Sequence, residues 1–195
     1  MIKGSDKRHA DYLIDAIFLN RWSPRAMSGE AIPAEELKVL FEAARWAPSS
    51  YNNQPWRILY ARRDSEHWPL FFDLLVDTNK AWCKNAAALL VMISKTTFDH
   101  SGKPSRTHSY DTGAAWENLA LQGCLRGYVV HGMQGFDYDR ARTALNIPDD
   151  FQVEAMAAIG LPGRVEELPE ALQARETPND RRTVEQTVCE GPFRL

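Results

Sequence analysis

The sequence predicts a mixed α+β fold, and three observations support this prediction. Residues 87–94 form an apolar run with the length of a central β-strand covered on both faces. Two longer stretches, 32–47 and 110–127, place apolar residues at helical spacing. Helices and strands alternate only in part along the chain, which favours α+β over a parallel doubly wound sheet.

The first half of the chain is expected to hold three helices and one strand. Residues 8–19 carry apolar side chains at helical spacing, and 32–47 begins at Pro33, which suits a first helical turn. Proline, serine and asparagine mark 48–55 as a loop before a strand at 56–62. A third helix is expected over 65–76, with Ser65 as a candidate N-cap.

The second half is expected to alternate strands and helices. After the central strand, the helix at 110–127 is rich in small residues, so neighbouring elements can approach it closely; Asp111 is a candidate cap. A strand should run from 128 into a glycine-bearing turn that ends at 136. A capped helix (137–147) and a final strand (around 154–163) follow. The polar, proline-broken tail from 164 should lie over a surface.

Composition excludes several classes of protein. The chain has 195 residues, 44% hydrophobic and 25% charged, with a net charge of −3, which suits one soluble domain and gives no electrostatic reason to bind nucleic acid. No apolar stretch is long enough to span a membrane, and the polar N-terminus resembles no signal peptide, so a cytoplasmic protein is expected. Cys83, Cys124 and Cys189 are widely separated and are expected to be buried free thiols.

Common catalytic motifs are missing from the sequence. It contains no G-x-x-x-x-G-K-[ST] phosphate loop, no H-E-x-x-H zinc motif and no G-x-S-x-G nucleophile elbow, and the glycines of 160–163 do not make a dinucleotide fingerprint. The sequence therefore gives no motif that would support a hydrolase or a metal enzyme. His131 lies beside a glycine and is open to two interpretations, a structural histidine or a functional one.

Several loops nevertheless carry unusual concentrations of binding chemistry. Arginines around a serine at 20–27, with a further pair at 181–182, offer charge-assisted donors for a phosphate. Asparagine and glutamine amides at 48–56 and 79–86 can pair with the edge of a heterocycle. The glycine turn at 132–136 allows close approach of a flat ring. Together they match the needs of a mononucleotide-type cofactor, but such residues are common on surfaces, and taken alone they are more often solvated connections between helices.

The order of these motifs resembles the nitroreductase family of FMN-dependent NAD(P)H oxidoreductases. R-x-S-x-R at 21–25 is followed by A-P-S-S-x-N-x-Q-P-W at 47–56, a strand, and G-x-x-G-F at 132–136. The resemblance implies an α+β sandwich with a central, mostly antiparallel sheet, working as an intertwined homodimer. Residues 1–195 would form a single FMN-binding domain, with the tail from about 164 to 195 packing on the partner subunit.

The resemblance also assigns roles to individual residues. Arg21, Trp22, Ser23 and Arg181, with Arg182 beside it, would hold the FMN phosphate, and Arg25 would lie against the flavin N1 and C2 carbonyl. Asn79 would address the pyrimidine edge, while Gln134 and Gly135 would face N5. Pro48, Ser49 and Asn52 would come from the other subunit. The walls of the substrate pocket are expected to include Trp82, Tyr128 and Phe136.

Two positions depart from the family pattern. Gln134 stands where the family often has an acidic residue or glycine, so the charge near N5 could differ. Trp82 stands where some members have lysine, so Arg25 becomes the one expected cation at that end of the ring. A fixed cation there would stabilise the reduced flavin and raise its potential.

The implied activity is transfer of hydride from NAD(P)H through FMN to an acceptor such as a quinone or nitroaromatic, with ping-pong kinetics and no catalytic protein residue. Two alternatives remain open. One is a flavoenzyme of the same fold with other chemistry, such as reductive dehalogenation or flavin cleavage, although 95–110 is the one short polar stretch that could act as a lid. The other is a flavin-free binding domain.

Overall fold

The computed structural model describes residues 2–194, and within them four strands form one antiparallel sheet. The strand order is β1-β2-β4-β3, so the two middle strands are non-consecutive in sequence. The strands are β1 (Trp56–Arg62), β2 (Ala88–Lys95), β3 (Val129–Met133) and β4 (Phe151–Gly160). The predicted α+β class is confirmed. So is the central strand at 87–94, since β2 pairs on both edges and all but its last residue is buried.

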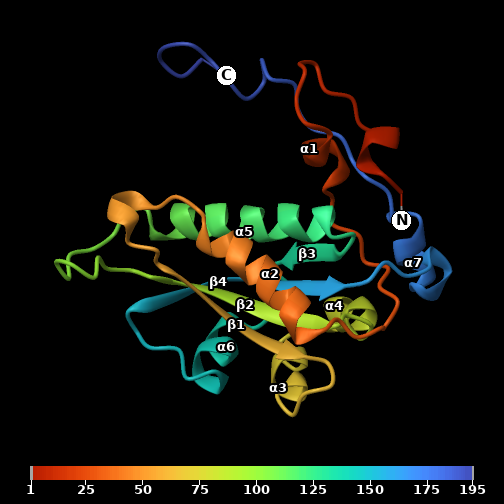
Figure 1. Cartoon of the computed structure of the whole chain (residues 1–195), viewed down its shortest axis with the longest axis horizontal. Coiled ribbons are helices and arrows are strands. Elements are labelled where there is room, and N and C mark those ends of the chain that lie inside the picture. The colour runs from red at the N-terminus through yellow and green to blue at the C-terminus, as the bar shows by residue number, and fades with distance from the viewer. Residues whose placement is uncertain (1, 195) are drawn as a thin grey trace.

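Helices cover both faces of the sheet (Figure 1). One face carries α2 (Ala34–Arg45) and α5 (His108–Leu125), which pack on each other. The opposite face carries α3 (Trp68–Phe72), α4 (Asp77–Cys83) and α6 (Tyr138–Ala144). The tail adds α7 (Glu170–Gln173) and a short 3₁₀ turn, Val165–Glu167.

The alternation of side chains along β2 builds two hydrophobic cores. Leu89, Val91 and Ile93 join the core under α3, α4 and α6. Leu90, one residue out of phase, joins the core with Leu40 of α2 and the central residues of α5. Successive residues of a strand point to opposite faces, so a strand that is apolar throughout supplies both cores.

Two predicted helices are shorter in the structure than in the sequence pattern. Residues 8–19 contain helix only at α1 (Ala16–Asn20), because no helical face is buried there: Leu13 is fully exposed and Ile14 and Phe18 are about half exposed. The helix expected over 65–76 is reduced to α3. The Ser65 hydroxyl donates to the Arg62 carbonyl at 2.7 Å instead of capping a helix.

Two further expectations need correction. Asp111 is not the cap of the central helix but lies inside the first turn of α5, where its buried carboxylate accepts from the Ser50 amide at 3.1 Å and the Thr107 hydroxyl at 3.2 Å. It therefore anchors the 48–52 loop to α5. The three thiols are free, but only Cys83 is buried, whereas Cys189 lies exposed in the tail.

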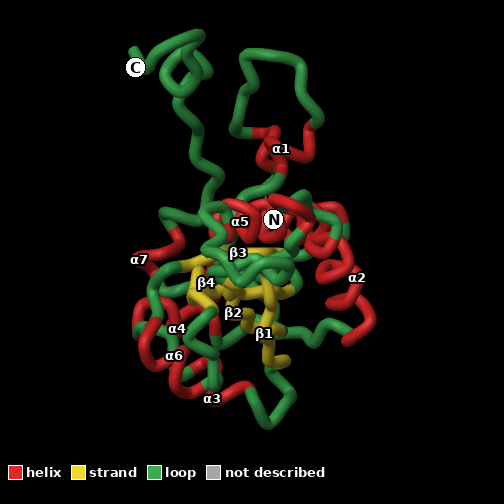
Figure 2. The backbone as a smooth tube through the Cα atoms, turned by 90° about the vertical axis from the view of Figure 1, so that its left-hand side faces the viewer, coloured by secondary structure: helices red, strands yellow, loops and turns green. Residues whose placement is uncertain are grey.

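Both terminal segments extend from the same side of the molecule, beyond α5 (Figure 2). The segment around α1 and the chain after about residue 180 project away from the layered body and run near each other. Within residues 2–194, no helix is both long and apolar enough to cross a membrane.

Candidate functional site

The elbow between α1 and α2, residues 21–26, is fixed by contacts with three distant parts of the chain. The Trp22 indole N–H donates to the Ile2 carbonyl at 3.0 Å. The Pro24 carbonyl lies 2.8 Å from His131 Nδ1 of β3. The Arg25 and Ala26 amides donate to Glu176 of the C-terminal segment. The elbow therefore has one defined position relative to the sheet and the tail.

Beside the elbow lies a cavity of about 480 Å³, here called the arginine cavity. Its walls come from the N-terminal segment, the elbow, β3 and the C-terminal segment. The lining residues in the described chain are Arg8, Arg21, Trp22, Ser23, Arg25, His131, Gly132, Arg175, Thr177, Asn179 and Arg181. Five residues that the sequence analysis predicted for the cofactor site therefore line one cavity, although they lie up to 160 residues apart in the chain. They are Arg21, Trp22, Ser23, Arg25 and Arg181.

Positive charge dominates this cavity. Arg8 is 5% exposed and donates to the carbonyls of Asn179 at 2.8 Å, Leu19 at 3.0 Å and Arg21 at 2.8 Å. Burial, together with the guanidinium groups of Arg181 and Arg21, lowers the pKa of Arg8. Mutually repelling cations held at fixed positions are an arrangement that an anion would stabilise.

Carboxylates compensate this charge only in part. Arg21 Nε lies 3.4 Å from a Glu117 oxygen, and that glutamate is half exposed on α5. Arg21 Nη1 reaches the Ser23 hydroxyl at 3.5 Å, at the limit of a hydrogen bond. Arg25 Nη1 lies 3.7 Å from Glu176 Oε2, which is an ion pair but too long for a hydrogen bond.

His131 forms part of the cavity wall as a neutral imidazole. Its ring packs against the Trp82 ring at 4.5 Å between centroids, and burial lowers the pKa of His131 to about 4. Because the Pro24 carbonyl can only accept, Nδ1 must carry the hydrogen in this contact. The side chain is therefore hydrogen-bonded and structural, and it also contributes to the cavity surface.

A second cluster of predicted site residues consists of Asn79, Trp82 and Gly135, and Trp82 connects it to His131. Asn79 Nδ2 donates to the Gly135 carbonyl at 3.0 Å, and its Oδ1 accepts from the Trp82 indole at 3.3 Å. A Cβ atom at Gly135 would lie 2.5 Å from Asn79 Nδ2, so a larger residue would displace the Asn79 amide. The Asn79 amide thus holds the 132–136 turn, and Gln134 lies exposed on it.

Other nominated residues lie away from the arginine cavity within this chain. Pro48, Ser49 and Asn52 belong to the loop that Asp111 fastens to the beginning of α5, whereas Arg21 contacts that helix six residues further along (Figure 1). Arg182 lines a neighbouring groove between the terminal segments.

Two of the expected pocket walls serve packing within the chain. The Tyr128 hydroxyl donates to Glu36 at 3.1 Å. Phe136 is buried and its ring stacks on Tyr138 at 4.0 Å between centroids.

Sequence reasoning missed part of the cavity lining. Arg8, Arg175, Thr177 and Asn179 come from polar terminal stretches without a motif, and nothing local separates them from surface residues. The one available signal is that the tail keeps arginines at 175, 181 and 182 although it contributes little to the hydrophobic core.

The structure is thus an antiparallel α+β sandwich with an arginine-lined cavity beside its edge strand β3. Comparison with known proteins gives the family. Residues 19–81 match the model of the nitroreductase family. One solved structure, described as an oxidoreductase containing FMN, is 48% identical, covers 99% of each chain and superposes with a TM-score of 0.94. The chain belongs to the nitroreductase family.

More distant similarities extend over most of the chain. The protein DrgA of Synechocystis sp. is 28% identical over 182 residues, covering 80% of this chain and 85% of that protein. A nitroreductase family protein from Streptococcus pneumoniae TIGR4 shares 17% identity and the same fold, with a TM-score of 0.69 over 88% of this chain and 96% of that one.

Proposed function

We propose that this chain binds FMN in the arginine cavity and uses it to carry electrons from NAD(P)H to a flat organic acceptor such as a quinone or nitroaromatic. The arginine cavity is the observation that carries the proposal. Its volume of about 480 Å³ falls in the range of ~300–1,000 Å³ that is usual for cofactor and ligand sites. The 48%-identical relative that contains FMN supports the same cofactor here.

The residues of the cavity fit a phosphate group. Arg21 and Arg181 supply guanidinium donors, which match phosphate oxygens in geometry as well as in charge. Ser23 adds a hydroxyl, and the buried Arg8 adds fixed charge behind them. An unliganded cluster of this kind repels itself, so binding of a dianion relieves an electrostatic cost that the fold otherwise bears.

The ring of the cofactor is assigned to the side of the cavity bounded by Arg25 and Gly132, where the 132–136 turn begins. When bound, FMN supplies a ring that takes up a hydride and returns two electrons to a second substrate. Arg25 places positive charge where it stabilises the reduced ring. His131 stays neutral near pH 7 and so adds no second cation. The Asn79 amide keeps the glycine turn in place for close approach.

The proposal includes alternating use of one site. NAD(P)H would bind, give up its hydride and leave before the acceptor occupies the same space, which predicts parallel lines in double-reciprocal plots. No protein nucleophile or general acid is assigned, because the chemistry belongs to the cofactor and the protein contributes binding, orientation and electrostatics.

We further propose that the working unit is a homodimer of single-domain subunits. Pro48, Ser49 and Asn52 would complete the site of the partner, because the Asp111 contact holds their loop away from the cavity of their own chain. The segment from about 164 to 195 would pack on the partner subunit. Exposed apolar side chains in both terminal segments, including Leu13, Phe18 and Val188, support this role.

The decisive experiment is an absorbance spectrum of the purified protein between 300 and 550 nm, before and after anaerobic NAD(P)H. A yellow protein that bleaches supports the proposal. Arg21→Ala removes a charge-assisted contact worth about 1.5–3 kcal/mol, so it should weaken FMN binding about 10- to 100-fold. Arg164→Ala, at an exposed arginine of the tail, is the matched control. A colourless protein that takes up no added FMN would contradict the proposal.

A further inference from the structure

Glu176 is a buried carboxylate that the proposed function does not yet use. Its side chain is 2% exposed, although it lies in a tail that is otherwise mostly solvent-exposed. Oε1 accepts from two consecutive elbow amides, Arg25 N at 2.5 Å and Ala26 N at 2.8 Å. Because 150 residues separate donor and acceptor, this contact is tertiary and joins the tail to the elbow.

We propose that Glu176 is a positioning residue that holds Arg25 in place and acts as its counter-charge, and so sets the electron affinity of the cofactor site. This inference rests on the proposed function, since it assumes that Arg25 faces a bound flavin. It gives the C-terminal segment a role in setting the potential of the flavin ring, in addition to the role proposed for Arg181 at the phosphate.

The two oxygens of Glu176 have separate tasks. Oε1 fixes the backbone at 25–26, and a carboxylate that accepts two amide hydrogens holds that backbone more firmly than a neutral acceptor would. Oε2 has no hydrogen-bond partner in the described chain, and its nearest cation is Arg25, with Nη1 at 3.7 Å. The backbone and the side chain of Arg25 are therefore held by one group.

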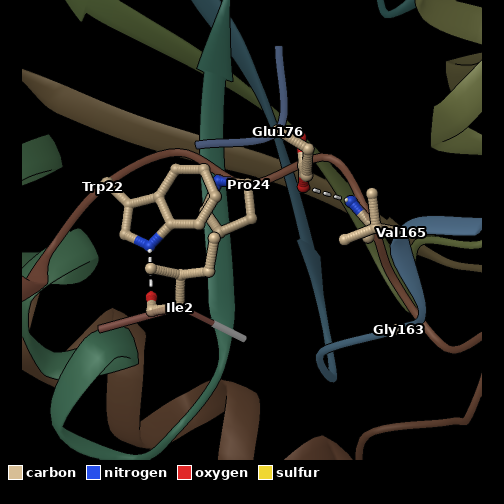
Figure 3. A pocket seen from close by; sticks show the side chains of 7 residues that line it. Ile2, Trp22, Pro24, Gly163, Val165 and Glu176 are labelled. Carbon is tan, nitrogen blue, oxygen red and sulfur yellow. Dashed lines mark hydrogen bonds between the residues drawn. The ribbon is translucent and has the colours of Figure 1, made fainter. Parts of the chain in front are cut away.

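The surroundings of Oε2 make this pairing effective. Glu176 lines a second cavity, of about 220 Å³, whose other walls are largely apolar and include Trp22, Pro24 and Val165 (Figure 3). Apolar walls screen charge poorly, so the field of the carboxylate acts on Arg25 more strongly than it would at the surface.

Arg25 is placed to pass this effect to the cofactor site. Its side chain is 22% exposed, and it lines both the arginine cavity and a narrow cleft that Trp82 and Asn85 also line. Arg25 therefore pairs with Glu176 at 3.7 Å and also lines the cavity to which the ring is assigned. The negative charge of Glu176 offsets part of the positive charge that Arg25 presents to that space.

The direction of the effect follows from these charges. Glu176→Gln keeps an oxygen that can accept the two elbow amides but removes the negative charge. The full charge of Arg25 then acts on the ring and favours the reduced form, so the flavin midpoint potential should rise. We expect about a tenfold shift in the reduction equilibrium, which is about 30 mV for a two-electron couple.

The test is a double-mutant cycle on FMN-loaded protein. Midpoint potentials are measured for the wild type, Glu176→Gln, Arg25→Met and the double variant, together with the dissociation constant of FMN. Glu170→Gln is the matched control, since Glu170 lies exposed in the same segment, at the beginning of α7. Glu176→Asp, which withdraws the carboxylate by one methylene, is the second variant in case the glutamine variant folds poorly, and it should give a smaller rise.

The expected result is a higher potential in Glu176→Gln, a lower one in Arg25→Met, and little further change when Glu176→Gln is added to Arg25→Met. Equal shifts from Glu176→Gln in both backgrounds would overturn the inference, because Glu176 would then act independently of Arg25. So would unchanged potentials in both Glu176 variants. A wild-type protein that binds no FMN would overturn the inference together with the proposed function, whereas the preceding outcomes leave that function intact.

Discussion

His131 illustrates how burial decides the charge of one side chain at the arginine cavity. Its pKa of about 4 in the folded protein lies below the ordinary value near 6.5, so the unfolded chain binds a proton that the folded one does not. Folding stability should therefore fall as the pH drops from about 6.5 to about 4, by up to ~3 kcal/mol from this residue. Urea unfolding of cofactor-free protein at several pH values measures the effect.

The control for this prediction is His131→Asn, whose amide nitrogen can still donate to the Pro24 carbonyl but does not titrate. The wild-type stability should decline more steeply than that of the variant between these pH values. Parallel curves for the two proteins would show that His131 does not contribute to the acid sensitivity.

The three cysteines differ in reactivity because they differ in burial. Burial raises the pKa of Cys83 strongly and that of the half-buried Cys124 less, while Cys189 is exposed. Since the thiolate is the reactive form, a thiol reagent should modify Cys189 first, Cys124 slowly, and Cys83 only after unfolding. Mass spectrometry of timed samples follows this order, and Cys189→Ser should abolish the first phase. Rapid labelling of Cys83 in native protein would contradict the packing of the core.

At the scale of elements, the contact of α5 with the sheet depends on Gly123. A Cβ atom there would lie 2.4 Å from Val130 Cγ2 of β3, and the β-branched valine has little freedom to move away. Gly123→Ala should therefore destabilise the fold by about 1–3 kcal/mol, although alanine favours helix. Gly113→Ala on the same helix meets nothing within 4 Å and should stabilise by about 0.5–1 kcal/mol. In thermal unfolding experiments, the melting temperature should fall in Gly123→Ala and rise in Gly113→Ala.

The elements that the sequence predicted well are those whose own side chains bury a complete face. For α2, Leu37, Leu40 and Ala44 are buried at helical spacing, and β2 is apolar throughout because both its faces are covered. The 8–19 segment has the same spacing of apolar residues, but none of its apolar side chains is buried in the chain. Periodicity predicts a helix only when a partner surface exists, and that surface is absent from the local sequence.

The same contrast applies to the candidate site. Arg21, Ser23 and Arg25 could be nominated because they are close together in a recognisable order. Arg8 and Glu176 acquire their roles only through tertiary contacts, with the carbonyls of 19, 21 and 179 and with the amides of 25 and 26 respectively. A polar residue in a polar segment gives no local sign that folding will bury it.

At the scale of the whole molecule, the two terminal segments expose large apolar side chains to solvent, which is unfavourable for a subunit on its own. Leu13 is fully exposed and Phe18 is 54% exposed, and both lie on the segment that projects beyond α5 (Figure 2). If a second copy of the chain covers them, each contributes about 1.5–3 kcal/mol of burial. Leu13→Ser combined with Phe18→Ser should then raise the dimer dissociation constant at least ~100-fold and reduce FMN binding in parallel. Sedimentation equilibrium measures the first effect and flavin absorbance the second.

Leu70→Ser, at a 39%-exposed leucine on the opposite face of the sheet, is the control and should change neither the dimer dissociation constant nor FMN binding. A wild-type protein that sediments as a monomer while holding FMN at full stoichiometry would show that each subunit builds its site alone.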